Sequence, residues 1–182
     1  MTPDPTNREF QAAAEAILQG TGSLFLTGKA GTGKTTFLKH VREASPRRTV
    51  VVAPTGIAAL NAGGVTIHSM FGIPPKLPLT EWTADQIAQQ VKLSKRKRSI
   101  VEKLELLIID EVSMVRADLL DVIDAVLRKY SVRAAGRVLP FGGAQVLMIG
   151  DPYQLPPVVT RDERPGLLAR YASPFFFEAE AF

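Results

Sequence analysis

A glycine-rich octapeptide at residues 28–35 constrains this chain more than any other stretch. It reads Gly-Lys-Ala-Gly-Thr-Gly-Lys-Thr, follows an apolar run at 23–27 that predicts a buried strand, and leads into a helical pattern at 36–41. In that setting, backbone N–H groups turn inward and the helix N-terminus adds partial positive charge, so the loop can cradle phosphates. The spacing predicts a nucleoside triphosphate site rather than an ordinary glycine-rich turn.

Individual positions of this loop have expected roles. Lys34 should reach the β- and γ-phosphates, and the Thr35 hydroxyl should ligate Mg²⁺. The loop residues expected to contact the nucleotide are Gly28, Ala30, Gly31, Thr32, Gly33, Lys34, Thr35 and Thr36.

Two later strands end in polar residues suited to the same chemistry. The apolar run 106–109 ends in Asp110 and Glu111. An acid at the tip of a buried strand can hold Mg²⁺ directly or through water, and a neighbouring acid can take a proton from the attacking water. Two solvent-facing acids are the alternative, which the upstream loop disfavours. Beyond a further strand at 144–149, Gln154 could hydrogen-bond a γ-phosphate or orient the attacking water.

Composition limits the remaining choices. The 182 residues carry a net charge of +4, which permits a polyanionic partner without requiring one. The chain has no cysteine, which excludes disulfides and indicates a reducing compartment. Neither a signal peptide nor an apolar run of membrane length is found, so we expect no membrane association. We expect an intracellular protein of the cytoplasm or nucleoid, or of the nucleus or mitochondrion in a eukaryote.

The order of elements predicts an α/β fold. A Thr6–Glu9 capping box should start a helix over 10–18, and a β-branched run predicts a strand over 49–53. A short helix is predicted over 57–61 and a longer amphipathic one over 117–132, on which Asp121 and Asp124 look solvated. Because strands and helices alternate, the sheet should be mostly parallel and flanked by helices.

The middle of the chain is less regular. Segment 73–103 is interpreted as an insertion or loop region, since three prolines interrupt 73–79, although 84–91 has a helical pattern. It also contains a basic run, 92–98, which has two possible interpretations. The run is either a solvated face or loop, or a contact to a phosphate backbone.

Taken together, several strings resemble the Pif1 family of superfamily 1B DNA helicases. The strings are Gln11 with the phosphate loop, Ala-Pro-Thr-Gly-Ile-Ala-Ala at 53–59, 66–71, Ile-Asp-Glu-Val-Ser-Met at 109–114, 140–143, and Gly-Asp-Pro-Tyr-Gln-Leu-Pro-Pro at 150–157. The phosphate loop and the acid pair occur in many NTPases, whereas the longer strings are much more specific. The resemblance covers nearly the whole chain.

The resemblance implies a RecA-like P-loop NTPase domain over 1–182, the first motor domain of an ATP-dependent helicase moving 5′ to 3′ on single-stranded DNA. It implies ATP and Mg²⁺ as cofactors, with Gln11 on adenine and Thr35 and Asp110 on the metal. The catalytic residues it implies are Lys34, Asp110, Glu111 and Gln154. The DNA contacts it implies are Thr55, Gly56, His68, Ser69 and Phe71, with ordinary packing in a turn as the alternative for His68 and Phe71. Family roles in DNA repair, recombination and telomere maintenance are implied likewise.

Two departures from the family pattern matter. Family members continue into a second RecA-like domain that supplies arginines to the γ-phosphate, whereas this sequence stops at Phe182. We therefore expect the isolated chain to bind ATP, hydrolyse it weakly and not unwind duplex. Phe10 replaces the acid usual before Gln11, which weakens the adenine assignment. The competing interpretations are a nucleotide-switched binding module completed by a partner, and a P-loop ATPase of another kind.

Overall fold

Short apolar runs pair into one parallel sheet in the computed structural model, which describes residues 7–20, 22–74, 81–132 and 138–182. The strands are β1 (Leu24–Thr27), β2 (Thr49–Ala53), β3 (Val65–Thr66), β4 (Leu106–Ile109) and β5 (Gln145–Gly150). Their order in the sheet is β1-β5-β4-β2-β3, and every pairing is parallel. The expected α/β fold is confirmed. All strands therefore end at the same edge of the sheet, and β5 lies between β1 and β4.

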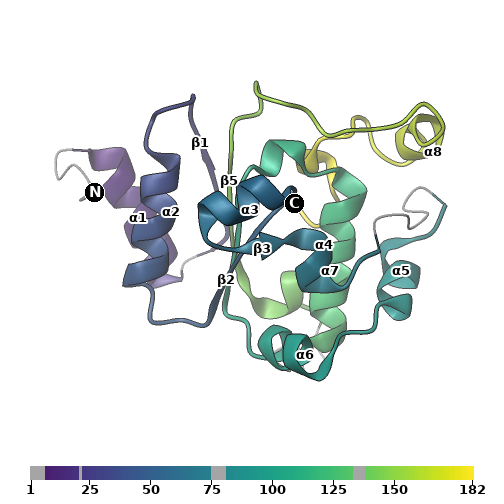
Figure 1. The fold of residues 1–182 in the computed structure, drawn as a ribbon, viewed down its shortest axis with the longest axis horizontal. Helices are drawn as coiled ribbons and strands as arrows, with labels where there is room; N and C mark the ends of the chain where they lie inside the picture. Colours follow the sequence, from purple (N-terminus) through teal and green to yellow (C-terminus); the bar gives the residue numbers. More distant parts are fainter. Residues whose placement is uncertain (1–6, 21, 75–80, 133–137) are drawn as a thin grey trace.

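Helices cover both faces of this sheet (Figure 1). The α-helices are α1 (Arg8–Gln19), α2 (Lys34–Ala44), α3 (Gly56–Ala62), α4 (Ile67–Phe71), α5 (Ala84–Gln90), α6 (Lys95–Glu102), α7 (Ala117–Tyr130) and α8 (Arg164–Leu168). The 3₁₀ helices are η1 (Val112–Met114), η2 (Pro140–Gly143) and η3 (Phe176–Glu178). In the described part of the chain, no helix is long and apolar enough to cross a bilayer.

Alternation along the strands divides the core into two layers, since successive strand residues point to opposite faces. Ile108 and Leu147 join the cluster that contains Phe37 and Leu38 of α2. Their strand neighbours point the other way, into a larger cluster with α4, α5 and α7. Every residue of β4 is buried, which explains its uninterrupted apolar sequence.

The ends of two elements differ from the sequence prediction. Helix α1 begins at Arg8 with Asn7 as its N-cap, because the Asn7 side chain accepts the Phe10 N–H at 2.9 Å. The predicted cap, Thr6, lies outside the described residues. The short edge strand β3 was not predicted, because two residues are too few to show a strand period.

The segment 73–103 contributes to the core. It contains α5, whose Thr83 capping box is complete, and α6, which forms from the basic run. Ile87, Val91 and Val101 are at most 2% exposed and pack in the larger cluster. The irregular proline stretch lies largely outside the described residues.

The prediction that Asp121 and Asp124 are solvated is wrong. The Asp121 carboxylate accepts the Tyr171 hydroxyl at 2.7 Å and the Ala181 N–H at 2.9 Å, while Asp124 accepts the Phe141 N–H and pairs with Arg128. Both acids are buried on α7. They hold η2 and the C-terminal segment against this helix, so partners distant in sequence determine their burial.

This burial generates a stability prediction. Arg128 pairs with Asp124, whose side chain is 11% exposed, and with Asp85, whose side chain is 67% exposed. Asp124→Ala leaves the buried Phe141 N–H without its acceptor, so we expect the free energy of unfolding to fall by about 2–4 kcal/mol. Asp85→Ala, which removes the exposed pair, should cost within ~1 kcal/mol. Chemical denaturation of both variants measures the difference, and equal losses would contradict the assignment.

Candidate nucleotide and DNA site

The phosphate loop connects the end of β1 to the start of α2. Gly31 and Gly33 have φ values of 78° and 95°, in the left-handed region that favours glycine. Gly33 is the N-cap of α2 and provides no side-chain cap, so the first N–H groups of an eleven-residue helix remain open toward the loop. Thr35 and Thr36 lie in this first turn. The backbone therefore has the shape of an anion-binding loop.

Lys34 folds back across its own loop. Its Nζ donates to the carbonyl oxygens of Gly28 at 2.5 Å and Lys29 at 3.0 Å. The Thr32 hydroxyl donates to the same Lys29 carbonyl at 2.9 Å. A Cβ at Gly28 would lie 2.7 Å from that hydroxyl oxygen, so a larger residue there would displace the Thr32 side chain. The ammonium group is thus held over the loop where phosphates would bind.

A cavity of about 200 Å³ adjoins the loop on the α1 side. Its walls include Asn7, Glu9 and Phe10 from the beginning of α1, and Phe37 from α2. Gln11, expected on adenine, is exposed and is not among the lining residues. Sequence reasoning missed Asn7 and Phe10, although their position at the start of the helix before the phosphate loop was a usable signal.

Asp110 stands at the tip of β4. Its backbone N–H donates to the Val52 carbonyl at 2.8 Å, which continues the sheet pairing to this residue. Burial raises the pKa of the Asp110 carboxyl, opposed by a hydrogen bond from the Glu111 N–H and by attraction to Lys34. The Asp110 carboxylate at the end of β4 and the Lys34 ammonium of the phosphate loop are therefore close enough to attract each other.

Glu111 has a strained backbone. Its φ of 51° and ψ of 44° lie in the left-handed region, which a non-glycine residue adopts at a cost of order 1–3 kcal/mol. The conformation directs its N–H at the Asp110 carboxylate and starts η1. Such strain is concentrated at functional sites.

The turn after Glu111 packs on the end of β5. A Cβ at Gly150 would lie 3.0 Å from the Val112 nitrogen and 3.1 Å from the Ser113 nitrogen. Ser113 is 1% exposed, and its hydroxyl oxygen has no hydrogen-bond partner in the described part of the chain. The acid turn and the end of β5 are therefore in direct contact.

Beyond β5 the chain forms a hydrogen-bonded turn from Asp151 to Gln154. The Asp151 carboxylate accepts the Gln154 side-chain amide at 3.0 Å and the Tyr153 N–H at 3.1 Å. The Gln154 bond and the Tyr153 N–H hold the pKa of Asp151 below its ordinary value, and attraction to Lys34 and Lys29 adds to this. Asp151 was not singled out from the sequence, although it follows β5 as Asp110 follows β4.

These groups fit a nucleotide with Mg²⁺. One hydroxyl (Thr35), one carboxylate (Asp110) and a lysine beside a phosphate-shaped loop are the donor types that this pair needs. No group of three or more His, Asp or Glu side chains able to hold a metal occurs among the described residues. That absence is compatible with Mg²⁺, which keeps several waters and takes phosphate oxygens as ligands.

The residues expected on DNA lie at the other end of the same sheet edge, after β2 and β3. Thr55 caps α3 by accepting the Ala58 N–H at 3.2 Å, and Gly56 is exposed. His68 is half-buried, which lowers its pKa, and Ser69 is exposed. Phe71 is 0% exposed and belongs to the core. Its ring cannot stack on bases in this structure, so the packing alternative holds for Phe71.

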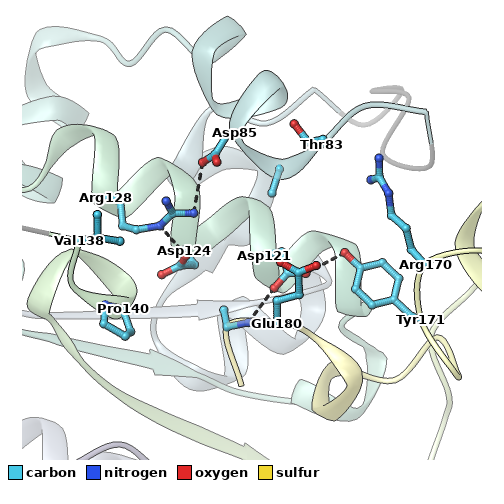
Figure 2. Close-up of a pocket in the computed structure, with 12 residues that line it drawn as sticks. Thr83, Asp85, Asp121, Asp124, Arg128, Val138, Pro140, Arg170, Tyr171 and Glu180 are labelled. Atoms are coloured by element: carbon cyan, nitrogen blue, oxygen red, sulfur yellow. Dashed lines mark hydrogen bonds and ion pairs between the residues drawn. The ribbon is translucent and has the colours of Figure 1, made fainter.

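A larger cavity, about 510 Å³, lies on different elements (Figure 2). Its lining comes from α5, α7, η2 and the C-terminal segment, and includes Asp121, Asp124 and Tyr171. Figure 2 shows these polar groups directed at one another, with Asp85 and Asp124 both joined to Arg128. Because these partners satisfy each other, the cavity is part of the packing around α7.

Comparison with known proteins agrees with this arrangement. The sequence profile of the family described as PIF1-like helicase matches residues 6–173. "ATP-dependent DNA helicase PIF1" of Homo sapiens is 40% identical over 168 residues, which is 90% of this chain and 24% of that protein. "ATP-dependent DNA helicase Pif1" of Bdellovibrio bacteriovorus is 39% identical over 155 residues, 85% of this chain and 34% of that protein.

Solved structures match over almost the whole chain. Bacteroides sp. Pif1 in complex with ADP-AlF4 superposes with a TM-score of 0.81 at 47% identity, covering 98% of this chain and 39% of that one. Bacteroides Pif1 bound to ssDNA superposes with a TM-score of 0.83 at 47% identity and the same coverage. The chain thus spans between about a quarter and two fifths of the length of these relatives. With its family profile, its phosphate loop and its acid turns in agreement, the chain belongs to the PIF1-like helicase family.

Proposed function

We propose that this chain is the ATP-binding motor domain of an ATP-dependent DNA helicase that moves 5′ to 3′ along single-stranded DNA. One observation carries the proposal. The phosphate loop, the Asp151 turn and Asp110 follow the adjacent strands β1, β5 and β4, and Lys34 attracts both carboxylates. The names of the relatives support the helicase activity, which extends the proposal from nucleotide binding to DNA.

Each residue has a proposed task. Lys34 exchanges its two loop carbonyls for the β- and γ-phosphate oxygens, while the open N–H groups of α2 hold the remaining phosphate charge. Thr35 and Asp110 would hold Mg²⁺. When bound, Mg²⁺ neutralises charge that develops on the phosphates. Glu111 takes a proton from the attacking water. Asn7 and Phe10 join Gln11 as candidates for the base.

Gln154 is proposed as the sensor of the γ-phosphate. Its amide is bonded to Asp151 in this structure, so contact with a γ-phosphate requires it to leave that carboxylate. The movement would be transmitted to η1 through Gly150, where the backbones of the two turns touch. Nucleotide state would then alter the loop that begins at Asp151.

Thr55, Gly56, His68 and Ser69 are proposed to contact single-stranded DNA. Hydroxyls and backbone N–H groups suit sequence-independent contact to phosphate and sugar. The ssDNA-bound Pif1 relative supports this class of partner. Roles in repair, recombination and telomere maintenance are part of the same proposal and rest on the family resemblance alone.

Turnover by this chain alone is proposed to be weak. In the described part of the chain, no arginine lines the cavity beside the phosphate loop. An arginine supplied from elsewhere raises the rate of this kind of chemistry by about 10³–10⁵. We propose that a second RecA-like domain supplies it.

Substitutions separate binding from chemistry. We expect Lys34→Ala to weaken binding of a fluorescent ATP analogue at least ~10-fold, because a charge-assisted contact to phosphate is lost. Glu111→Gln should bind normally but lose turnover, and chelation of Mg²⁺ should abolish turnover in the unmodified chain. Lys39→Ala, which removes an exposed lysine from the same helix, is the control. Equal effects of the two lysine changes would contradict the phosphate role.

The dependence on a second domain has its own test. We expect Mg²⁺-ATP hydrolysis by this chain to stay low with and without a single-stranded oligonucleotide, since no arginine among the described residues lines the cavity beside the phosphate loop. Phosphate release measures the rate. Turnover that rises with DNA and disappears in Lys34→Ala would show a self-sufficient motor. Tight nucleotide binding without turnover, even with a second RecA-like domain added, would favour a nucleotide-switched binding module.

The DNA assignment predicts loss of ATP-coupled binding. Thr55→Ala with His68→Ala should reduce affinity for a labelled oligothymidine about 10-fold, since each lost contact is worth roughly 0.5–1.5 kcal/mol. Fluorescence anisotropy with and without nucleotide measures it. Thr83→Ala, which removes the N-cap of α5, controls for the loss of a helix cap. Unchanged binding in the double variant would overturn the assignment.

Ser113 gives a prediction in two directions. A buried hydroxyl without a hydrogen-bond partner does not stabilise the nucleotide-free chain. Ser113→Ala should therefore leave the free energy of unfolding unchanged or raise it by up to ~1 kcal/mol. The same change should slow turnover several-fold, because Ser113 is in the turn that positions Glu111. Thermal unfolding and single-turnover kinetics test both. A clear loss of stability with an unchanged rate would identify Ser113 as purely structural.

A further inference from the structure

Residues 95–98 of the basic run form the first turn of a helix anchored in the core, and residues 92–94 lead into it. Helix α6 starts after Ser94, which caps it by accepting the Lys97 N–H at 3.4 Å, and Val101 near its end is 1% exposed. Residues 92–98 contain five lysines and arginines and no acid. The whole chain has a net charge of +4, so without these five cations its net charge would not be positive.

Helix α6 contacts the surface proposed for DNA. The Lys97 ammonium donates to the backbone carbonyl of Ser69 in α4, a residue already placed on the proposed DNA surface. Lys95 and Arg96 lie two and one positions before Lys97 in the first turn of α6, so they are close to the Lys97–Ser69 contact along the chain but project from other sides of the helix. The first turn of α6 is therefore joined to α4, the helix that follows β3.

The five cations of the basic run differ in their interaction partners. Arg98 pairs with Glu102 at 2.6 Å and lies over the Tyr130 ring, and Lys97 is bonded to Ser69. Lys92, Lys95 and Arg96 are exposed, and they form no ion pair within the described ranges. These last three are available to an anionic partner.

Helix stability does not account for this charge. The first turn of a helix favours acidic side chains, yet α6 has no acid there and has cations in its place. Lys95 and Arg98, three positions apart on one side of α6, are like charges that also repel one another. A polyanion lying along the turn would relieve both effects.

We propose that Lys92, Lys95 and Arg96 extend the single-stranded DNA surface from α4 onto α6, where they bind backbone phosphates without reading bases. The proposal rests on the proposed function, since it takes the loops of α3 and α4 as the adjoining DNA contacts. Lysine and arginine on phosphate give affinity and salt dependence rather than sequence preference.

Salt dependence of binding tests this surface. Anisotropy of a labelled oligothymidine, titrated with this chain at several KCl concentrations, gives the slope of log K against log salt. Each lost phosphate contact should reduce the slope by ~0.7, so Lys95→Gln with Arg96→Gln should reduce it by about 1.4 and Lys92→Gln by a further ~0.7. Oligonucleotides of other base composition should give the same reduction.

A charge-matched control distinguishes contact from net charge. Lys39→Gln with Arg161→Gln removes two exposed cations from α2 and from the segment before α8. A slope reduction equal to that of the α6 variant would overturn the proposal, as would a reduction seen only with duplex DNA. Thermal unfolding checks the fold, and the α6 variant should melt at the same temperature or slightly higher, because its first turn loses unfavourable charge.

The outcomes separate this inference from the proposed function. If the Thr55 and His68 variant loses DNA binding while the α6 variant keeps the salt slope of the unmodified chain, the α6 surface is refuted. The proposed helicase function is then unaffected. If the unmodified chain fails to bind single strands at low salt with nucleotide present, the DNA part of the proposed function and this extension both fall.

Discussion

The parallel pairing of β5 with β1 on one side and β4 on the other is the constraint on which the site depends. It places the ends of three strands together, so backbone pairing brings the phosphate loop, the Asp151 turn and Asp110 to one edge of the sheet. Residues in parallel register cannot be shifted one at a time, because a slip would move buried side chains to the opposite face. The apolar strands therefore fix the relative positions of the polar groups that follow them.

Two unfavourable local features gather where these strand ends meet. Glu111 is held in the left-handed region, and the Ser113 hydroxyl is buried without a partner in the described residues. Glycine at 150 lets the neighbouring turn approach closely enough to hold both. The packed sheet supplies the stability that maintains them. Local rules that fail beside a reactive group are the expected signature of a site shaped for chemistry.

The sequence was informative where a local pattern determines structure. The strand and helix on either side of the phosphate loop and the strand before Asp110 were predicted from the sequence, because glycine spacing and apolar runs are recognised within a few residues. Asp121 was misjudged because its partners, Tyr171 and Ala181, lie 50 and 60 residues further along the chain. Phe71 looked suited to stacking, and only the packed core shows that its ring is buried. Long-range packing is what the local patterns lack.

The arrangement also joins the proposed nucleotide and DNA surfaces through one sheet. The proposed nucleotide residues follow β1, β5 and β4, while Thr55 follows β2 and His68 follows β3 along the same edge. Asp110 bonds through its backbone to the Val52 carbonyl of β2, one residue before that strand ends. A displacement of the Asp110 turn would therefore act on the strand that leads to Thr55 through the backbone pairing of β4 with β2. Rigid strands are suited to transmit such a change because their packed residues cannot shift independently.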